Sequence, residues 1–261
     1  MLKITIQKMT QRIAEILERN IPAIYLYGSV TLDDFKIGWS DIDILVLTEH
    51  KISEAQAQKL VTLRQAMLEE DPENQYYRLF EGGMLTTNAL RLGTTDRVVY
   101  WGTSGERIDD HYSFDAFCMS ELLDTGILLY GNDVRAGFAH PSFDELKGNV
   151  RRHYETIRKY AKASGRSLYT YGWLLDISRC IYTLRTGKVI AKTAAGEWAL
   201  RENLCPCEAA LTKAVKIRNN PAVYKNNIEI FDYAETMDKE IQRYADVLEK
   251  ELKRKNEEGL I

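Results

Sequence analysis

The sequence contains little cysteine and little histidine, with only four residues of each type among 261. The Cys205-Pro206-Cys207 stretch lacks the two-residue spacing and the second cysteine pair that zinc sites use, and the histidines have no ligand partners at metal-binding spacing. The cysteines also make no regular disulfide framework, since they stand at Cys118, Cys180, Cys205 and Cys207. We therefore expect free thiols in a reducing compartment and no zinc site.

The sequence also lacks a basic excess and any long apolar run. Its 35 Lys and Arg residues stand against 38 Asp and Glu residues, for a net charge of -3 and a pI of about 5.9. Because the chain has no net positive charge to attract phosphate backbones, we expect no nucleic-acid partner. No stretch approaches the roughly 18 apolar residues that a membrane span needs, and polar residues occur throughout the first twenty positions. These features predict a cytoplasmic protein with no membrane partner.

Helical and strand patterns are mixed in the N-terminal part of the chain. Apolar residues recur at helical spacing over residues 6–19 and 57–68, and extended patterns cover residues 23–27, 77–80, 84–90 and 98–101. Such a mixture is typical of a sheet that packs against helices. We expect this domain to span residues 1–115.

The C-terminal part shows helical patterns only. Apolar stripes run along residues 146–161 and 230–252, and residues 171–184 are apolar on most sides, as in a buried helix. We therefore predict an α+β protein, with a mixed β-sheet and helices in the first domain and an all-α helical bundle over residues 116–261.

Residues 24–47 read IYLYGSVTLDDFKIGWSDIDILVL and place two aspartates in an apolar strand pattern. Residues two apart in a strand project to the same face, so Asp41 and Asp43 point together while Ile42 and Ile44 point into the opposite layer. A divalent cation relieves the repulsion between such carboxylates, and Mg²⁺ is usually held by one or two carboxylates plus substrate phosphates. We predict both aspartates as metal ligands. The alternative for Asp41, a turn or helix-cap residue, leaves Asp43 without a role.

A Gly28-Ser29 turn follows the apolar run that ends at Tyr27. Glycine lets the backbone approach a phosphate closely, and the serine hydroxyl with the following amides can donate hydrogen bonds to phosphate oxygens. We therefore predict Gly28 and Ser29 as nucleotide-binding residues that act with the aspartates on a metal-bound triphosphate.

These residues resemble the nucleotidyltransferase signature of the polymerase-β superfamily. The signature consists here of Tyr27-Gly28-Ser29, a gap of eleven residues, and then Asp-Ile-Asp-Ile from Asp41 onward. The resemblance implies an enzyme that uses Mg²⁺ and a nucleoside triphosphate. ATP is the usual donor in the family and is expected here as co-substrate.

Residues 174–198 are similar to the helical C-terminal domain of bacterial aminoglycoside adenylyltransferases of the streptomycin/spectinomycin type. Chain length and domain order agree with that family. A lysine in the loop after Thr186-Gly187-Lys188 reaches the nucleotide phosphates in the family, and Lys192 occupies that place here. The ammonium group is a compact point charge that suits a triphosphate. The alternative is a solvated surface lysine.

The family also supplies a third carboxylate, which acts as general base, from the strand after the next helix. Glu81 is the residue that matches it in this sequence. A carboxylate within hydrogen-bond reach of the acceptor hydroxyl can take its proton as the oxygen attacks the α-phosphorus. The alternative is a turn residue, because Gly82 and Gly83 follow directly.

The acceptor contacts are the least defined part of the prediction. The tryptophan that stacks on the antibiotic in the family is missing from the shorter stretch at residues 105–112. Carboxylates suit a polycationic acceptor, although Asp176 could equally form an intrahelical ion pair with Arg179. The candidates are Asp109, Asp110, Tyr112, Tyr171, Trp173 and Asp176.

The leading hypothesis is an adenylyltransferase that moves AMP from Mg-ATP to a hydroxyl of an aminoglycoside-type antibiotic and releases pyrophosphate, which implies a role in antibiotic resistance. Two alternatives stay open. The acceptor could be another metabolite or a protein, or the chain could be a nucleotide-binding regulator without catalysis. The resemblance further implies a monomer or weak dimer.

Overall fold

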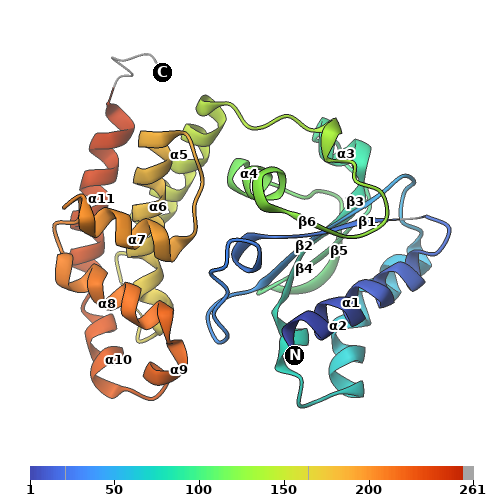
Figure 1. The fold of residues 1–261 in the computed structure, drawn as a ribbon, viewed down its shortest axis with the longest axis horizontal. Coiled ribbons are helices and arrows are strands. Elements are labelled where there is room, and N and C mark those ends of the chain that lie inside the picture. Colours follow the sequence, from blue (N-terminus) through green and yellow to red (C-terminus); the bar gives the residue numbers. More distant parts are fainter. Residues whose placement is uncertain (21, 164, 255–261) are drawn as a thin grey trace. The chain divides into compact units, whose positions relative to one another are not determined.

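The computed structural model describes residues 1–20, 22–163 and 165–254, and the chain forms two compact units. The sheet unit contains Met1–Asp33 and Ser40–His140, and the helical unit contains Asp34–Trp39 and Pro141–Ile261. Each unit can be followed by its colours in Figure 1. The short segment at residues 34–39 therefore belongs to the helical unit, although it lies between two stretches of the sheet unit along the chain.

A six-stranded mixed sheet forms the centre of the first unit, in the order β5-β4-β3-β2-β1-β6. Strands β2 and β3 are parallel, and the other neighbouring pairs are antiparallel. The strands are β1 (Ala23–Tyr27), β2 (Ile42–Thr48), β3 (Phe80–Thr86), β4 (Val98–Gly102), β5 (Gly105–Asp109) and β6 (Ile127–Tyr130). The central strands are apolar on both faces because helices cover the sheet from two sides.

Four helices cover this sheet, with α1 and α2 on one face and α3 and α4 on the other (Figure 1). They are α1 (Leu2–Leu17), α2 (Glu54–Glu70), α3 (Thr87–Leu92) and α4 (Ala116–Thr125), with short 3₁₀ turns at η1 (Gly28–Val30), η2 (Gln75–Leu79) and η3 (Arg135–Gly137). Side chains of β1 and β2 alternate between the faces: Tyr25 and Leu45 lie with the α3 and α4 side in one core cluster, and their strand neighbours face the other way.

Several local predictions are wrong, and each has a physical cause. Residues 77–79 belong to the 3₁₀ turn η2, which begins after the Asn74 side chain caps it. Strand β3 stops at Thr86, because the Thr86 hydroxyl accepts a hydrogen bond from the Ala89 amide and starts α3. The C-terminal part is not purely helical, since β6 lies beyond residue 115 and pairs with β1. The predicted helix at 230–252 is divided at Thr236 and Met237.

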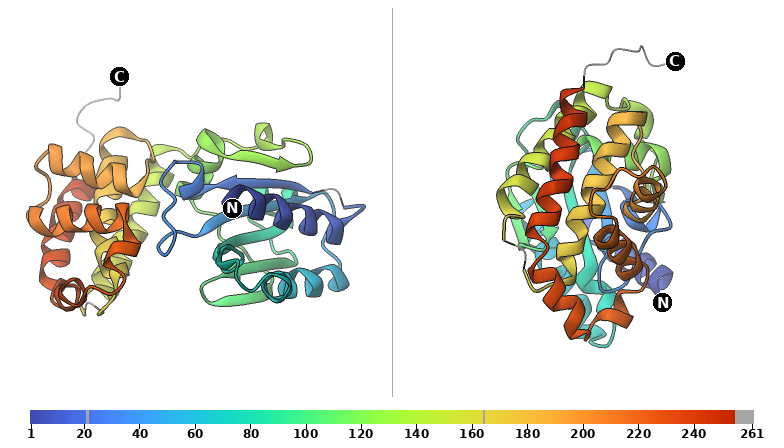
Figure 2. Two further views of the ribbon diagram at one scale, coloured as in Figure 1. Left: turned by 60° about the horizontal axis from the view of Figure 1, so that its bottom comes forward. Right: turned by 90° about the vertical axis from the view of Figure 1, so that its left-hand side faces the viewer.

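The second unit is all helical over its described residues, and the predicted α+β class is confirmed. Its helices are α5 (Phe143–Tyr160), α6 (Gly172–Thr186), α7 (Lys192–Arg201), α8 (Glu208–Asn219), α9 (Pro221–Tyr224), α10 (Ile228–Glu235) and α11 (Asp238–Lys253), with a 3₁₀ turn η4 (Leu168–Tyr171) before α6. Helices α5, α6 and α11 pack side by side, as two views show (Figures 1 and 2). Gly196 lets α7 approach closely, because a Cβ there would lie 2.7 Å from Leu175 Cδ2 and 2.8 Å from Val215 Cγ2.

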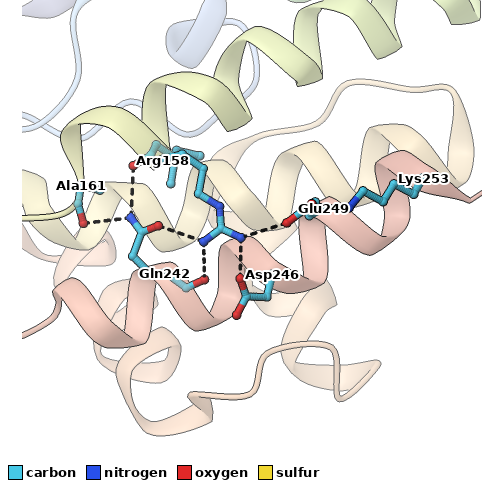
Figure 3. Close-up of polar contacts among 7 residues, drawn as sticks. Arg158, Ala161, Gln242, Asp246, Glu249 and Lys253 are labelled. Atoms are coloured by element: carbon cyan, nitrogen blue, oxygen red, sulfur yellow. Dashed lines mark hydrogen bonds and ion pairs between the residues drawn. The ribbon is translucent and has the colours of Figure 1, made fainter.

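Arg158 joins α5 to α11 through several polar contacts (Figure 3). Its Nη1 donates to the backbone and side-chain oxygens of Gln242 at 3.1 and 2.9 Å, and its Nη2 pairs with Asp246 and Glu249. The Gln242 amide in turn donates to the Ala161 carbonyl at 3.1 Å, at the end of α5. This cluster fixes the register of the two helices.

The helices of residues 1–20, 22–163 and 165–254 include none with the length and apolar character needed to cross a membrane.

Candidate active site

Two carboxylates meet on neighbouring strands at the start of the parallel pair. Asp43 of β2 lies in register with Glu81 of β3 and, on its other side, with Tyr27 of β1. Residues in register on adjacent strands project to the same face, so the two carboxylates share the face that carries α3 and α4. Asp41 directly precedes β2, two residues before Asp43. The structure therefore brings the three predicted carboxylates to one end of the sheet.

The Gly28-Ser29 turn closes over this end of the sheet. Gly28 has a φ of +72°, and a Cβ at this position would lie 2.3 Å from Asp43 Oδ2, so a side chain is excluded both by backbone conformation and by space. The Ser29 hydroxyl donates to the Asp41 backbone carbonyl at 3.3 Å. The glycine thus lets the turn lie against the Asp43 carboxylate, and the serine hydroxyl bonds the turn to the backbone of Asp41.

Glu81 is partly buried and accepts a hydrogen bond from a tyrosine on the neighbouring strand. The Tyr100 hydroxyl of β4 donates to Glu81 Oε1 at 3.2 Å, and the Arg107 guanidinium stacks 4.2 Å from the centre of the Tyr100 ring. Burial raises the pKa of Glu81, and the neighbouring Asp41 carboxylate raises it further, whereas the hydrogen bond from Tyr100 acts in the opposite direction. These are the surroundings expected of a carboxylate that accepts a proton during a reaction.

Asp41 and Asp43 are the side chains in this site that could hold Mg²⁺. Over the described part of the chain, no three His, Cys, Asp or Glu side chains are arranged as a metal site of their own. Mg²⁺ does not require such a cage, because it is commonly held by one or two carboxylates together with waters and substrate phosphates. The paired hard oxygen donors, with the Gly28 backbone lying close against the Asp43 carboxylate, fit a cation that arrives with a triphosphate.

Lys192 and Asp176 form an ion pair in the helical unit. Lys192 begins α7, and its Nζ lies 2.8 Å from Asp176 Oδ1 on α6, while Arg179 Nη2 lies 3.7 Å from the same oxygen. Burial alone would raise the pKa of Asp176. The charges of Lys192, Arg179 and His153 more than offset it and lower the pKa to about 2. Asp176 is therefore a largely buried, ionised carboxylate next to cationic side chains. The expected intrahelical pair with Arg179 is present, and contact with an acceptor stays a prediction.

The other acceptor candidates lie in different surroundings. Asp109 pairs with Arg107 at 2.9 Å and accepts a hydrogen bond from the Asp110 amide, at the exposed end of β5. The Tyr112 ring covers Gly83, where a Cβ would lie 2.5 Å from it. Tyr171 is fully buried, and its hydroxyl donates to the Ile230 carbonyl at 2.9 Å. Trp173 is partly buried on α6. Tyr112 and Tyr171 thus contribute to packing in the sheet unit and the helical unit, respectively.

Sequence reasoning missed two polar groups near these residues. Tyr100 was predicted only as part of an extended segment, and no local pattern marks it as a partner of Glu81. The second group is the carboxylate of Asp34, which accepts hydrogen bonds from the Thr193 hydroxyl at 2.6 Å and from Arg218 Nη2 at 2.9 Å. Thr193 directly follows Lys192, so Asp34 fixes the first turn of α7. The only sequence signal for Asp34 is its position between the Gly-Ser turn and Asp41.

Comparisons with known proteins identify related families for both parts of the chain. Residues 9–79 match the nucleotidyltransferase domain family, and residues 147–251 match the C-terminal domain family of aminoglycoside adenylyltransferases. The fold is similar to that in the crystal structure of spectinomycin adenyltransferase AAD(9) from Enterococcus faecialis with ATP and spectinomycin. That similarity has a TM-score of 0.64 and 13% sequence identity, over 93% of this chain and 97% of that chain. No curated protein sequence matches the chain.

The fold and the two family matches define a nucleotidyltransferase, so the chain is an enzyme of that class. More particularly, it is an aminoglycoside-adenylyltransferase-like nucleotidyltransferase, which confirms that part of the resemblance found in the sequence.

Proposed function

We propose that this enzyme transfers AMP from Mg-ATP to a hydroxyl group of a small cationic acceptor of the aminoglycoside type and releases pyrophosphate. The observation that carries the proposal is the register of Asp43 with Glu81, with Gly28 against the Asp43 carboxylate. This arrangement offers ligands for a metal-bound triphosphate next to a carboxylate that can accept a proton. The solved structure of AAD(9), which contains ATP and spectinomycin, supports the choice of donor and acceptor class.

On the donor side, we assign Asp41 and Asp43 as the Mg²⁺ ligands. Bound Mg²⁺ supplies positive charge that stabilises the negative charge developing on the phosphate oxygens. The backbone at Gly28 and the Ser29 hydroxyl are assigned to the phosphates, where Ser29 would exchange its hydrogen bond to the Asp41 carbonyl for one to a phosphate oxygen. In the helical unit, Lys192 is assigned to the phosphates as well.

Glu81 is assigned as the general base. Its carboxylate takes the proton of the acceptor hydroxyl while the hydroxyl oxygen forms a bond to the α-phosphorus and the bond to the pyrophosphate oxygen breaks. A raised pKa makes Glu81 a better proton acceptor than an exposed glutamate. The hydrogen bond from Tyr100 holds one carboxylate oxygen, Oε1, and so orients the group.

Acceptor recognition is assigned to carboxylates rather than to aromatic stacking. Asp176 is ionised and largely buried, so its interaction with an ammonium group would be weakly screened by solvent. Lys192 pairs with this carboxylate in the structure, so the group already accepts an ammonium ion as partner. Asp109 and Asp110 add negative charge at the end of β5.

The experiment that tests the proposal is pyrophosphate release from Mg-ATP across a panel of aminoglycosides, spectinomycin and lincosamides. Asp43→Asn removes one metal ligand with little change in shape, and Asp124→Asn, an exposed carboxylate on α4 that pairs with His140, is the matched control. We expect release that depends on one compound, is kept in the control and is lost in Asp43→Asn.

Turnover retained by Asp43→Asn would overturn the assigned site. Binding of Mg-ATP without release for any compound would instead direct the search to a metabolite or protein acceptor, or to a regulatory role. Filter binding with tRNA tests the expectation that nucleic acid is not a substrate.

A further inference from the structure

Two cysteine sulfurs lie in contact in the loop between α7 and α8, a segment that can be followed in Figure 1. The Cys205 thiol donates to Cys207 Sγ over 3.7 Å, and the Cys207 thiol donates to the Glu240 carbonyl at 3.2 Å. Each cysteine is 8% exposed. Only Pro206 separates them, so the pair is held together by a short, stiff stretch of backbone. None of the functions assigned above uses these thiols.

Cys207 has the surroundings of a reactive thiol. It occupies the N-cap position of α8, a helix of 12 residues, where unpaired amides and the helix dipole favour a negative charge. The hydrogen bond from Cys205 lowers the pKa of Cys207, and the charge of Arg243 lowers it further, whereas burial and the Glu240 carboxylate oppose the change. The same hydrogen bond raises the pKa of Cys205, so Cys207 is the sulfur that loses its proton more readily of the two.

We propose that Cys205 and Cys207 form a modification site at which a hydroperoxide, such as hydrogen peroxide, joins the two sulfurs in an intramolecular disulfide. With hydrogen peroxide, the Cys207 sulfur attacks one peroxide oxygen and the O–O bond breaks. The proton of the Cys207 thiol leaves with the departing hydroxide as water, and Cys207 becomes a sulfenic acid. Cys205 then attacks the Cys207 sulfur, and the hydroxyl leaves as a second water. Two thiols are oxidised and one peroxide is reduced, a balanced two-electron exchange.

The remaining cysteines provide an internal contrast. Burial raises the pKa of Cys118 well above its ordinary value, and the nearby carboxylates of Asp115 and Glu121 raise it further. Cys180, on α6, is fully buried. The sulfur–sulfur contact described above joins Cys205 and Cys207, and the proposed chemistry is therefore placed in the Cys-Pro-Cys loop.

Disulfide formation would also change the contact between this loop and α11. A disulfide requires a sulfur separation of about 2.05 Å, so the two sulfurs must move together from 3.7 Å. It also removes the proton that Cys207 shares with the Glu240 carbonyl. In the oxidised loop, the two sulfurs are thus closer together, and the loop has one hydrogen bond fewer to α11.

The test treats the full chain, carrying Cys118→Ser and Cys180→Ser, with hydrogen peroxide and follows it by intact-mass spectrometry and peptide mapping. We expect the loss of two hydrogens, a crosslink mapped to Cys205 and Cys207, and reversal by dithiothreitol. Mapping of the oxidised wild-type chain provides the same readout if the serine variants do not fold. An unchanged mass, or oxygen addition to a single cysteine without a crosslink, would overturn the proposal.

Two single variants test the order of attack. In Cys205→Ser, the sulfenic acid on Cys207 cannot resolve, so we expect labelling of Cys207 by dimedone after peroxide treatment. In Cys207→Ser, we expect labelling of Cys205 to be at least tenfold slower than labelling of Cys207 in Cys205→Ser, because Cys205 does not lie at the N-cap of α8. Equal labelling of both variants would contradict the assignment of Cys207 as the attacking sulfur.

Discussion

Arg218 and Asp34 form a buried ion pair, in which Arg218 Nε and Nη2 both donate to Asp34 Oδ2, at 3.1 and 2.9 Å. Their side chains are only 5% and 6% exposed. Removing one charge of such a pair leaves the other buried without compensation, which typically destabilises a protein by about 3 to 5 kcal/mol. We expect a loss of this size for Asp34→Asn in urea denaturation.

The neighbouring Asp33 provides the matched control for this prediction. Asp33 is exposed and has a φ of 54°, a conformation that asparagine tolerates well, so Asp33→Asn should change the unfolding free energy by less than about 0.5 kcal/mol. Similar small effects of both variants would show that the ion pair contributes little.

Tyr100→Phe tests the orientation of the proposed base. The substitution removes the hydroxyl that holds Glu81 Oε1 but keeps the ring on which Arg107 stacks. We expect kcat to fall about tenfold or more with little change in KM for ATP, by analogy with other groups that orient reactive ligands. Tyr160→Phe, at an exposed tyrosine of α5, should leave both constants unchanged. A change in KM alone would argue against a positioning role.

Gly28→Ala should impair the site more than it impairs the fold. An alanine at positive φ costs about 1 to 2 kcal/mol, and the new Cβ would also displace the Asp43 carboxylate. Gly93→Ala introduces a similar strain at φ +62° with nothing within 4 Å of the new Cβ. We therefore expect comparable losses of thermal stability in the two variants, but loss of AMP transfer only in Gly28→Ala. Full activity of Gly28→Ala would contradict the close approach described above.

Asp176 should contribute to stability in a pH-dependent manner. Its pKa of about 2 in the folded chain lies below the value of about 3.9 in an unfolded chain, so folding favours the ionised form. The contribution is fully present above about pH 4 and is lost as the pH falls toward 2. We expect the stability difference between the wild type and Asp176→Asn to shrink over this range in denaturation measurements. A difference that is constant with pH would contradict the paired, ionised state.

Arg158→Met tests the contact between α5 and α11. The variant loses the hydrogen bonds to Gln242 and the pairs with Asp246 and Glu249 that Figure 3 shows, while it keeps much of the apolar stem. We expect a loss of about 1 to 2 kcal/mol, reduced at high salt. Arg166→Met removes a single exposed pair with Asp232 in the same unit and should have an effect below about 1 kcal/mol.

The parts of the site that could be predicted from sequence depend on local spacing. The two-residue period of a strand is sufficient to place Asp41 and Asp43 on the same face. Gly28 can be recognised from the sequence as a turn residue because it follows the end of an apolar strand. Glu81 could be identified as the third carboxylate only through the resemblance to a family. The pairing of β2 with β3, which places Glu81 beside Asp43, joins residues 38 positions apart, and nothing within either strand specifies it.

The features that escaped prediction depend on contacts between distant residues. Asp34 and Arg218 are 184 positions apart, and Tyr100 reaches Glu81 across an antiparallel strand pair. Strand β6 has only four residues, too few for a periodic pattern, and it is defined by its pairing with β1. The domain boundary expected at residue 115 remains a prediction, whereas the compact units divide after His140, because α4 and β6 pack with β1.

The segment at residues 34–39 makes the helical unit discontinuous in sequence. The polypeptide consequently passes from one unit to the other three times, and no single cut separates them. A fragment ending at His140 would carry Asp34 and Trp39 without the helices that bury them, and the complementary fragment would present Arg218 without its carboxylate. Exchange of domains between relatives at the single boundary after His140 would therefore combine an Asp34 loop from one parent with helices from another. Hybrid enzymes should require two additional crossovers, one on each side of this loop.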